Sequence, residues 1–112
     1  MITVANRIEV APKDAEAFER AFRERAGLVD QTPGFVRNQV LRPTREGDPY
    51  VVLTTWRSYE AFLAWTKSEA FKHAHAQARG TPTGANKLEV HQVIQDSDQP
   101  ELEAEPPLQL EP

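Results

Sequence analysis

The chain has 112 residues, with 17 acidic and 13 basic side chains, nine prolines and no cysteine. That length fits one domain with a modest core, and the lack of cysteine excludes disulfides, thiolate nucleophiles and cysteine-based metal sites. No apolar run is long enough to span a bilayer and no signal-like segment opens the chain, so we predict a soluble, cytoplasmic protein that neither enters nor binds a membrane.

The acidic balance belongs to the last seventeen residues, which hold six of the acids, no Lys or Arg, and four of the nine prolines. Residues 1–95 therefore carry a small positive formal charge of about +2. We predict a folded domain over residues 1–95 and a mostly disordered acidic tail over residues 96–112. The basic residues of the domain form no clustered stripe, so nucleic-acid binding is not expected.

In residues 2–10, apolar side chains alternate with mostly polar ones, which is typical of a half-buried β-strand. Asn6 is the exception on the otherwise apolar side, which it shares with Ile2, Val4, Ile8 and Val10. A buried amide without partners costs about 1–3 kcal/mol, so Asn6 either bonds to nearby backbone or faces a cavity. Taken alone, the residue favours the backbone interpretation.

A turn at residues 11–14 leads into a helix predicted over residues 15–29, because the apolar positions there keep helical spacing. Its charged residues form a solvated face, in which Glu16 pairs with Arg20 and Glu19 with Arg23 one turn apart. This helix is expected to cover one face of the sheet.

Two strands follow, at residues 35–42 and 50–57, and the polar turn at residues 44–49 joins them as an antiparallel hairpin. On the first strand we expect Val36 and Val40 on one face, and Phe35 and Leu41 on the other. The second strand is apolar on both faces. One helical layer covers only one face of a sheet, so a second subunit is expected to cover the other.

Two short helices are predicted next, capped by Ser58 and Ser68. The first carries Trp65, and the second carries Phe71 and then the histidines. His75 lies one turn beyond Phe71 at the margin of an apolar stripe, whereas His73 points nearly the opposite way. A single histidine at such a margin usually has a structural role, and these residues alone favour that interpretation.

The last strand is predicted over residues 86–95, with Leu88, Val90 and Ile94 on its apolar side and His91 exposed or at a subunit contact. The order strand, helix, strand, strand, helix pair, strand matches an α+β ferredoxin-like sandwich with a four-stranded antiparallel sheet. Right-handed crossovers put both helical layers on one face of that sheet. A homodimer packed sheet to sheet would cover the other.

Asn6 in the first strand, Trp65 after the hairpin and His75 within AWTKSEAFKHAH make residues 2–95 resemble the antibiotic biosynthesis monooxygenase superfamily of dimeric α+β barrels. The segments NRIEV, TPGF and PYVVLTTW extend the resemblance, which is greatest to the haem-degrading monooxygenases of the IsdG type. In that family an Asn, a Trp and a His form the site. The resemblance implies that Asn6, Trp65 and His75 form it here, and it favours a site over a structural role.

The resemblance implies that haem is both substrate and oxygen-activating cofactor. His75 would ligate the iron, with His73 as a competing ligand. Trp65 would distort the macrocycle from planarity beside Phe71, and Asn6 would donate a hydrogen bond to an iron-bound oxygen species. Molecular oxygen and an external electron donor would open the porphyrin ring and release iron.

Two alternatives stay open. The first is a cofactor-independent monooxygenase of aromatic or polyketide compounds, because a pocket lined by Trp and Phe suits any flat aromatic substrate. The second is a non-catalytic dimer that binds haem or another small molecule without turnover.

Overall fold

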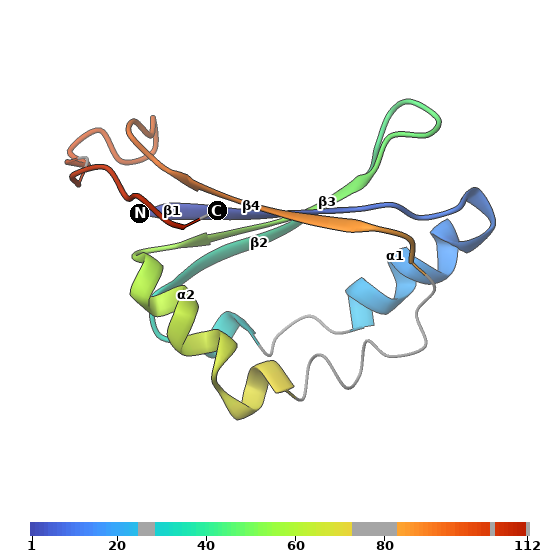
Figure 1. The fold of residues 1–112 in the computed structure, drawn as a ribbon, viewed down its shortest axis with the longest axis horizontal. Helices are drawn as coiled ribbons and strands as arrows, with labels where there is room; N and C mark the ends of the chain where they lie inside the picture. Colours follow the sequence, from blue (N-terminus) through green and yellow to red (C-terminus); the bar gives the residue numbers. More distant parts are fainter. Residues whose placement is uncertain (25–28, 73–82, 104, 112) are drawn as a thin grey trace.

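A computed structural model describes residues 1–24, 29–72, 83–103 and 105–111. Its strands form one antiparallel sheet in the spatial order β2-β3-β1-β4. The strands are β1 (Ile2–Ile8), β2 (Phe35–Leu41), β3 (Tyr50–Trp56) and β4 (Asn86–Gln92). The helices α1 (Ala15–Glu24) and α2 (Tyr59–Thr66) lie on the same face of the sheet, toward opposite ends of it (Figure 1). The predicted ferredoxin-like α+β arrangement is confirmed.

Among the residues that the structure describes, the core on this helix face forms two separate clusters. At one end, Ile2, Val4 and Trp56 are buried and pack against the aromatic side of α2. At the other end, Ile8 and Tyr50 pack against Phe18 of α1. Each helix therefore seals one end of the sheet, and the middle of the helix face belongs to neither cluster.

The β2 strand differs from its prediction in which side chains share a face. A β-bulge between Phe35 and Arg37 inserts an extra residue, so Phe35 pairs with Trp56 while Val40 pairs with Val52. The prediction that Phe35 shares a face with Leu41 is wrong, because the extra residue shifts the alternation by one. The Phe35 ring instead lies edge-on to Trp56, with 5.6 Å between ring centroids.

Helix starts were predicted better than helix and strand ends. The Ser58 hydroxyl accepts from the Ala61 N–H at 3.1 Å and so caps α2 as expected. The prediction that the first helix extends to residue 29 is wrong, because Val29 belongs to the separate 3₁₀ helix η2 (Val29–Gln31). Ile94 lies beyond the end of β4 and is 77% exposed, and His91 is exposed as predicted.

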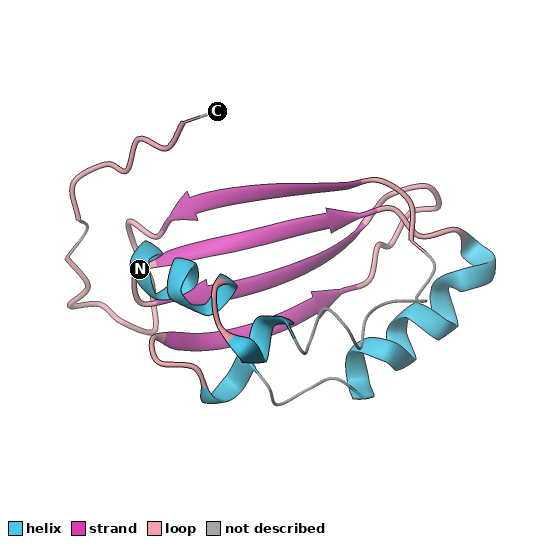
Figure 2. Cartoon of the chain, turned by 60° about the horizontal axis from the view of Figure 1, so that its bottom comes forward, coloured by secondary structure: helices cyan, strands magenta, loops and turns pink. Residues whose placement is uncertain are grey.

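The opposite face of the sheet carries half-buried Ala5, Val51 and Leu53 and the exposed Leu41. The tail runs on from the end of β4 (Figure 2), where the Gln92 amide donates to the Pro106 carbonyl and accepts from the Leu108 N–H. The domain boundary at residue 95 and the disorder of the tail stay predictions. Within the described ranges, no helix has the length and apolar character needed to cross a membrane.

Candidate functional site

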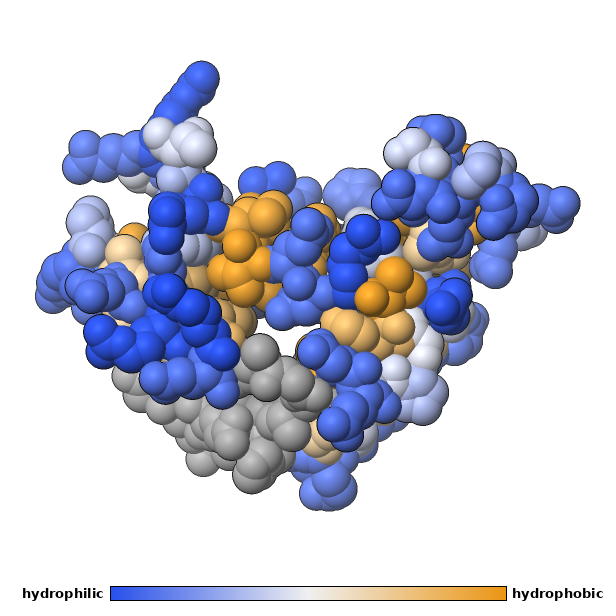
Figure 3. Space-filling view, turned by 180° about the vertical axis from the view of Figure 1, so that it is seen from behind, coloured by the Kyte–Doolittle hydropathy of each residue, from blue (hydrophilic) through white to orange (hydrophobic). Residues whose placement is uncertain are grey.

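The site begins with a row of paired residues that crosses the middle of the helix face, between the two core clusters. Directly opposite residues of antiparallel strands share a face, and the pairing places Val40, Val52, Asn6 and Leu88 in line across the four strands. Leu88 is 56% exposed and Val40 is 37% exposed. Figure 3 shows an opening in the molecule below the sheet. The row is therefore the floor of an open concavity on the helix side.

Asn6 holds the centre of that floor. Its side-chain Oδ1 is buried and finds no hydrogen-bond partner among the residues that the structure describes. The local alternative, in which this atom bonds to neighbouring backbone, is therefore not seen there. A buried unpaired polar atom costs about 1–3 kcal/mol and is uncommon in native proteins. Rotation of the amide exchanges its oxygen and nitrogen, so this end can offer a ligand either an acceptor or a donor.

Trp65 lies on α2 and packs on the cluster that includes Val4, the residue next to Asn6 along the same face of β1. Its ring centroid is 5.7 Å from that of Trp56 and 4.7 Å from that of Phe71, which meets it edge-on at 88°. Its Nε1 is also buried without a partner in the described part of the chain. Asn6 and Trp65 thus bring two unpaired polar atoms to the helix side of the sheet.

Ser68 fixes Phe71 against Trp65. The Ser68 hydroxyl accepts from the Phe71 N–H at 3.1 Å, as the predicted cap does, and donates to the Trp65 carbonyl at 2.6 Å. The structure therefore brings Trp65 and Phe71 into contact. The predicted ligand His75 and its competitor His73 lie outside the described residues, and their roles stay predictions.

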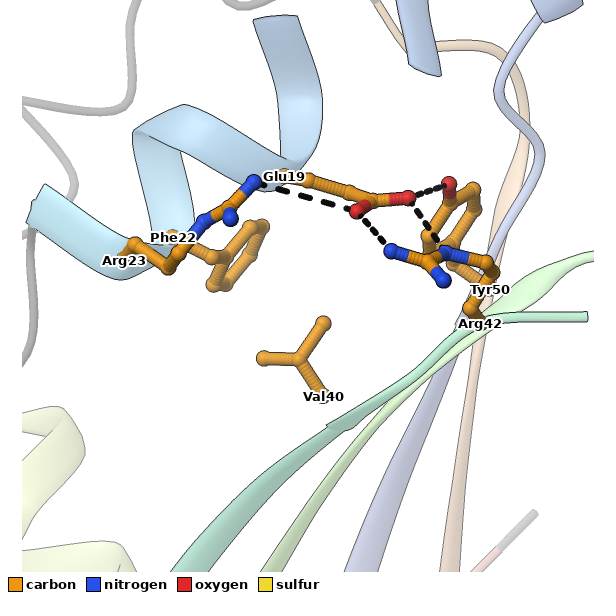
Figure 4. Close-up of a pocket in the computed structure, with 6 residues that line it drawn as sticks. All are labelled: Glu19, Phe22, Arg23, Val40, Arg42 and Tyr50. Carbon is orange, nitrogen blue, oxygen red and sulfur yellow. Dashed lines mark hydrogen bonds and ion pairs between the residues drawn. The ribbon is translucent and has the colours of Figure 1, made fainter. Parts of the chain in front are cut away.

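A polar cluster lies at the α1 side of the floor, and the sequence did not predict it. Arg42 donates to both carboxylate oxygens of Glu19, at 2.8 and 2.5 Å, and the Tyr50 hydroxyl also donates to that carboxylate (Figure 4). These hydrogen bonds, Arg42 first and then Tyr50, lower the pKa of Glu19 to about 2. Burial, and then the Glu19 carboxylate, raise the pKa of Tyr50.

This cluster corrects the prediction that all the charges of α1 form a solvated face. The Glu19 side chain is only 18% exposed, although its predicted pair with Arg23 is present at 3.9 Å. The shorter hydrogen bonds to Glu19 come from Tyr50 in β3 and from Arg42 just after β2. The one clue in the sequence is that Glu19 follows Phe18, which is fully buried, and so lies at the edge of the apolar stripe.

A cavity of about 410 Å³ lies beside this cluster, between α1 and the β2–β3 pair (Figure 4). Its lining residues are Glu19, Phe22, Arg23, Val40, Arg42 and Tyr50. Its volume falls within the range of small-molecule sites. Because Val40 also begins the floor row, the cavity adjoins the floor on the helix side of the sheet.

The chain is similar to known proteins in its sequence. Residues 1–77 match the family model described as antibiotic biosynthesis monooxygenase. The chain is 42% identical over 91 residues, 80% of its own length and 86% of the relative, to a haem oxygenase (mycobilin-producing) of Mycobacterium tuberculosis.

Two solved structures are similar to the fold. The haem-degrader MhuD of Mycobacterium tuberculosis, with two haems bound in its active site, superposes with a TM-score of 0.75 and 36% identity over 86% of this chain and 98% of that one. SnoaB of Streptomyces nogalater, a cofactor-independent oxygenase, superposes with a TM-score of 0.68 and 26% identity, over 86% of this chain and 95% of that one.

Proposed function

This chain belongs to the antibiotic biosynthesis monooxygenase family, and from that premise we propose that it is a haem-degrading monooxygenase. The observation that carries the proposal is the pair of buried polar atoms, Asn6 Oδ1 and Trp65 Nε1, which have no partner among the described residues. Both belong to the helix side of the sheet, beside an open floor that suits a flat ligand. The similarity to haem oxygenases supports haem as that ligand.

Each residue then has a distinct part. Bound haem supplies the iron that activates molecular oxygen and the meso carbon that is oxygenated, with electrons from an external donor. Asn6 offers a hydrogen bond from the centre of the floor. The aromatic pair of Trp65 and Phe71 would pack against the macrocycle, and Trp65 would distort it. His75 would hold the iron as a neutral imidazole.

We propose further that the protein is a homodimer. One layer of helices covers one face of the sheet, and the other face carries half-buried and exposed apolar side chains from three strands. A second copy packed on that face would remove them from water. The cytoplasmic location stays a prediction.

Haemin titration of the purified protein tests the function. We expect a Soret band on binding that is lost in His75→Ala and kept in His73→Ala, the matched control two residues away. Addition of a reductant and oxygen should then bleach the band and release iron. Binding without bleaching would instead support a non-catalytic haem-binding protein.

A second candidate is cofactor-independent oxygenation of a flat aromatic compound, which the similarity to SnoaB favours. The aromatic contact between Trp65 and Phe71 would serve such a substrate equally well. Failure of the wild-type protein to bind haemin would overturn the haem proposal and leave this candidate in its place.

A further inference from the structure

The cavity beside α1 combines apolar walls with an excess of positive charge. Phe22 and Val40 are its apolar side chains, and Glu19, Arg23 and Arg42 are its charged ones. Among the described lining residues, one carboxylate therefore faces two guanidinium groups. A ligand that places a carboxylate here would meet an uncompensated positive charge.

Arg23 is the guanidinium that such a ligand would meet. Arg42 is already engaged, since it donates through two nitrogens to Glu19. Arg23 has only a distant pair within the described ranges, with its Nη2 3.9 Å from a Glu19 oxygen that Arg42 already binds at 2.5 Å. Its side chain is 71% exposed. Arg42 thus occupies the carboxylate that would otherwise compete for Arg23.

The cavity and the floor are continuous through Val40, so a mostly apolar surface ends beside the charged groups of the cavity. Val40 lines the cavity and also pairs with Val52, which pairs in turn with Asn6. Neighbouring strands are about 4.8 Å apart, so Val40 and Asn6 are separated by roughly 10 Å across the sheet. A molecule with an apolar body and an anionic edge fits a floor that ends beside an arginine.

We propose that this cavity is the carboxylate end of the substrate site and that Arg23 binds the propionate groups of haem there. This inference rests on the proposed haem-degrading function, because haem is a flat apolar ring whose two carboxylates leave from one edge. Guanidinium groups match carboxylates with paired N–H donors, which makes arginine well suited to the task. Haem would then have a fixed orientation, its propionate edge at α1 and its ring over Asn6.

The test compares haemin with its dimethyl ester, which keeps the ring and iron but lacks the two negative charges. Both are titrated into the wild-type protein, Arg23→Gln and Arg20→Gln. Arg20 is the matched control, because it lies on the same helix, is 63% exposed and pairs with Glu16 rather than lining the cavity. Thermal unfolding of each variant checks that the fold is kept.

We expect Arg23→Gln to weaken haemin binding by about tenfold or more, as loss of a hydrogen bond between charged groups does, and to leave the ester unaffected. Arg20→Gln should change neither affinity. Equal losses for haemin and its ester, or no loss for haemin, would overturn the propionate assignment while the haem function stands. A wild-type protein that binds neither compound would overturn the proposed function and this inference with it.

Discussion

Asn6 is a polar residue among apolar side chains at the centre of a sheet face. Its buried side-chain oxygen has no hydrogen-bond partner within the described residues. We expect Asn6→Ala to leave the free energy of unfolding unchanged or to raise it by about 1 kcal/mol, because the unpaired polar atom is removed. Haem bleaching should slow by about 10²-fold, the usual cost of losing one aligned donor. Urea unfolding and the Soret decay measure the two effects.

Gln95→Ala is the control for that change, since Gln95 is an exposed side-chain amide beyond the end of β4. It should alter neither stability nor bleaching. If Asn6→Ala unfolded much more easily than the wild-type protein, its amide would be satisfied structurally and the site assignment would lose its main support.

Glu19 makes stability depend on pH in acid. Its pKa is lowered to about 2 by Arg42 and Tyr50, whereas an ordinary glutamate has a pKa of 4.5. The unfolded chain therefore takes up a proton at a higher pH than the folded chain, so this stabilisation is complete above pH 4.5 and fades as the pH falls toward 2. Urea midpoints of Glu19→Gln and wild type should differ at pH 7 and converge near pH 2.

Glu16→Gln provides the comparison, because Glu16 is 87% exposed and pairs only with Arg20 within the described residues. Its midpoint should follow that of the wild type at every pH. A Glu19→Gln difference that persists unchanged at pH 2 would mean that packing, rather than the ionised carboxylate, stabilises α1 against the sheet.

Asn6 and Glu19 show which site residues can be identified from the sequence and which cannot. Asn6 was found because it breaks a period of two, a pattern visible along one strand. Glu19 was misassigned because its partner Arg42 is 23 positions away, and only the folded chain brings them together. Local spacing identified the weaker pair with Arg23 and missed the stronger one.

At the scale of elements, local chemistry predicted the caps at Ser58 and Ser68, since a hydroxyl and the N–H groups of the next turn interact within a few residues. It missed the β-bulge after Phe35, because a bulge is a property of two paired strands and not of either one. That bulge decides that Phe35 joins the core beside Trp56.

The turn into β2 lies against α2, and Gly34 makes that approach possible. Its φ is +84°, and a Cβ added there would lie 2.5 Å from the Cβ of Ala61. Gly34→Ala should therefore lower the free energy of unfolding by about 2–4 kcal/mol, from the left-handed backbone together with the overlap. Urea denaturation measures the loss.

Gly47→Ala separates the two causes. Gly47 has a φ of +89°, but an added Cβ would meet nothing within 4 Å. Only the backbone cost of about 1 kcal/mol is expected there. Equal losses at the two positions would show that α2 moves freely away from the turn.

At the scale of the whole molecule, the order of elements was enough to predict the sheet and the placement of both helices on one face, because few topologies satisfy short right-handed connections. A cavity faced by Asn6 was one of two alternatives from the sequence, but the extent of the open floor could not be predicted. It exists because Phe18 and Trp56 anchor the two helices at opposite ends of the sheet, which leaves the Asn6 row between two cores.

The proposed dimer accounts for the face that the helices do not cover. Leu53 lies there, paired with Ala5 and Gln39 and half-buried in the single chain. We expect the wild-type protein to sediment as a dimer and Leu53→Glu as a monomer, because a carboxylate enclosed between two sheets would lack a partner. Ile94→Glu, an equal change at a 77% exposed site beyond β4, should stay dimeric. A monomeric wild type would overturn the proposed homodimer, whereas a dimeric Leu53→Glu would place the subunit contact elsewhere.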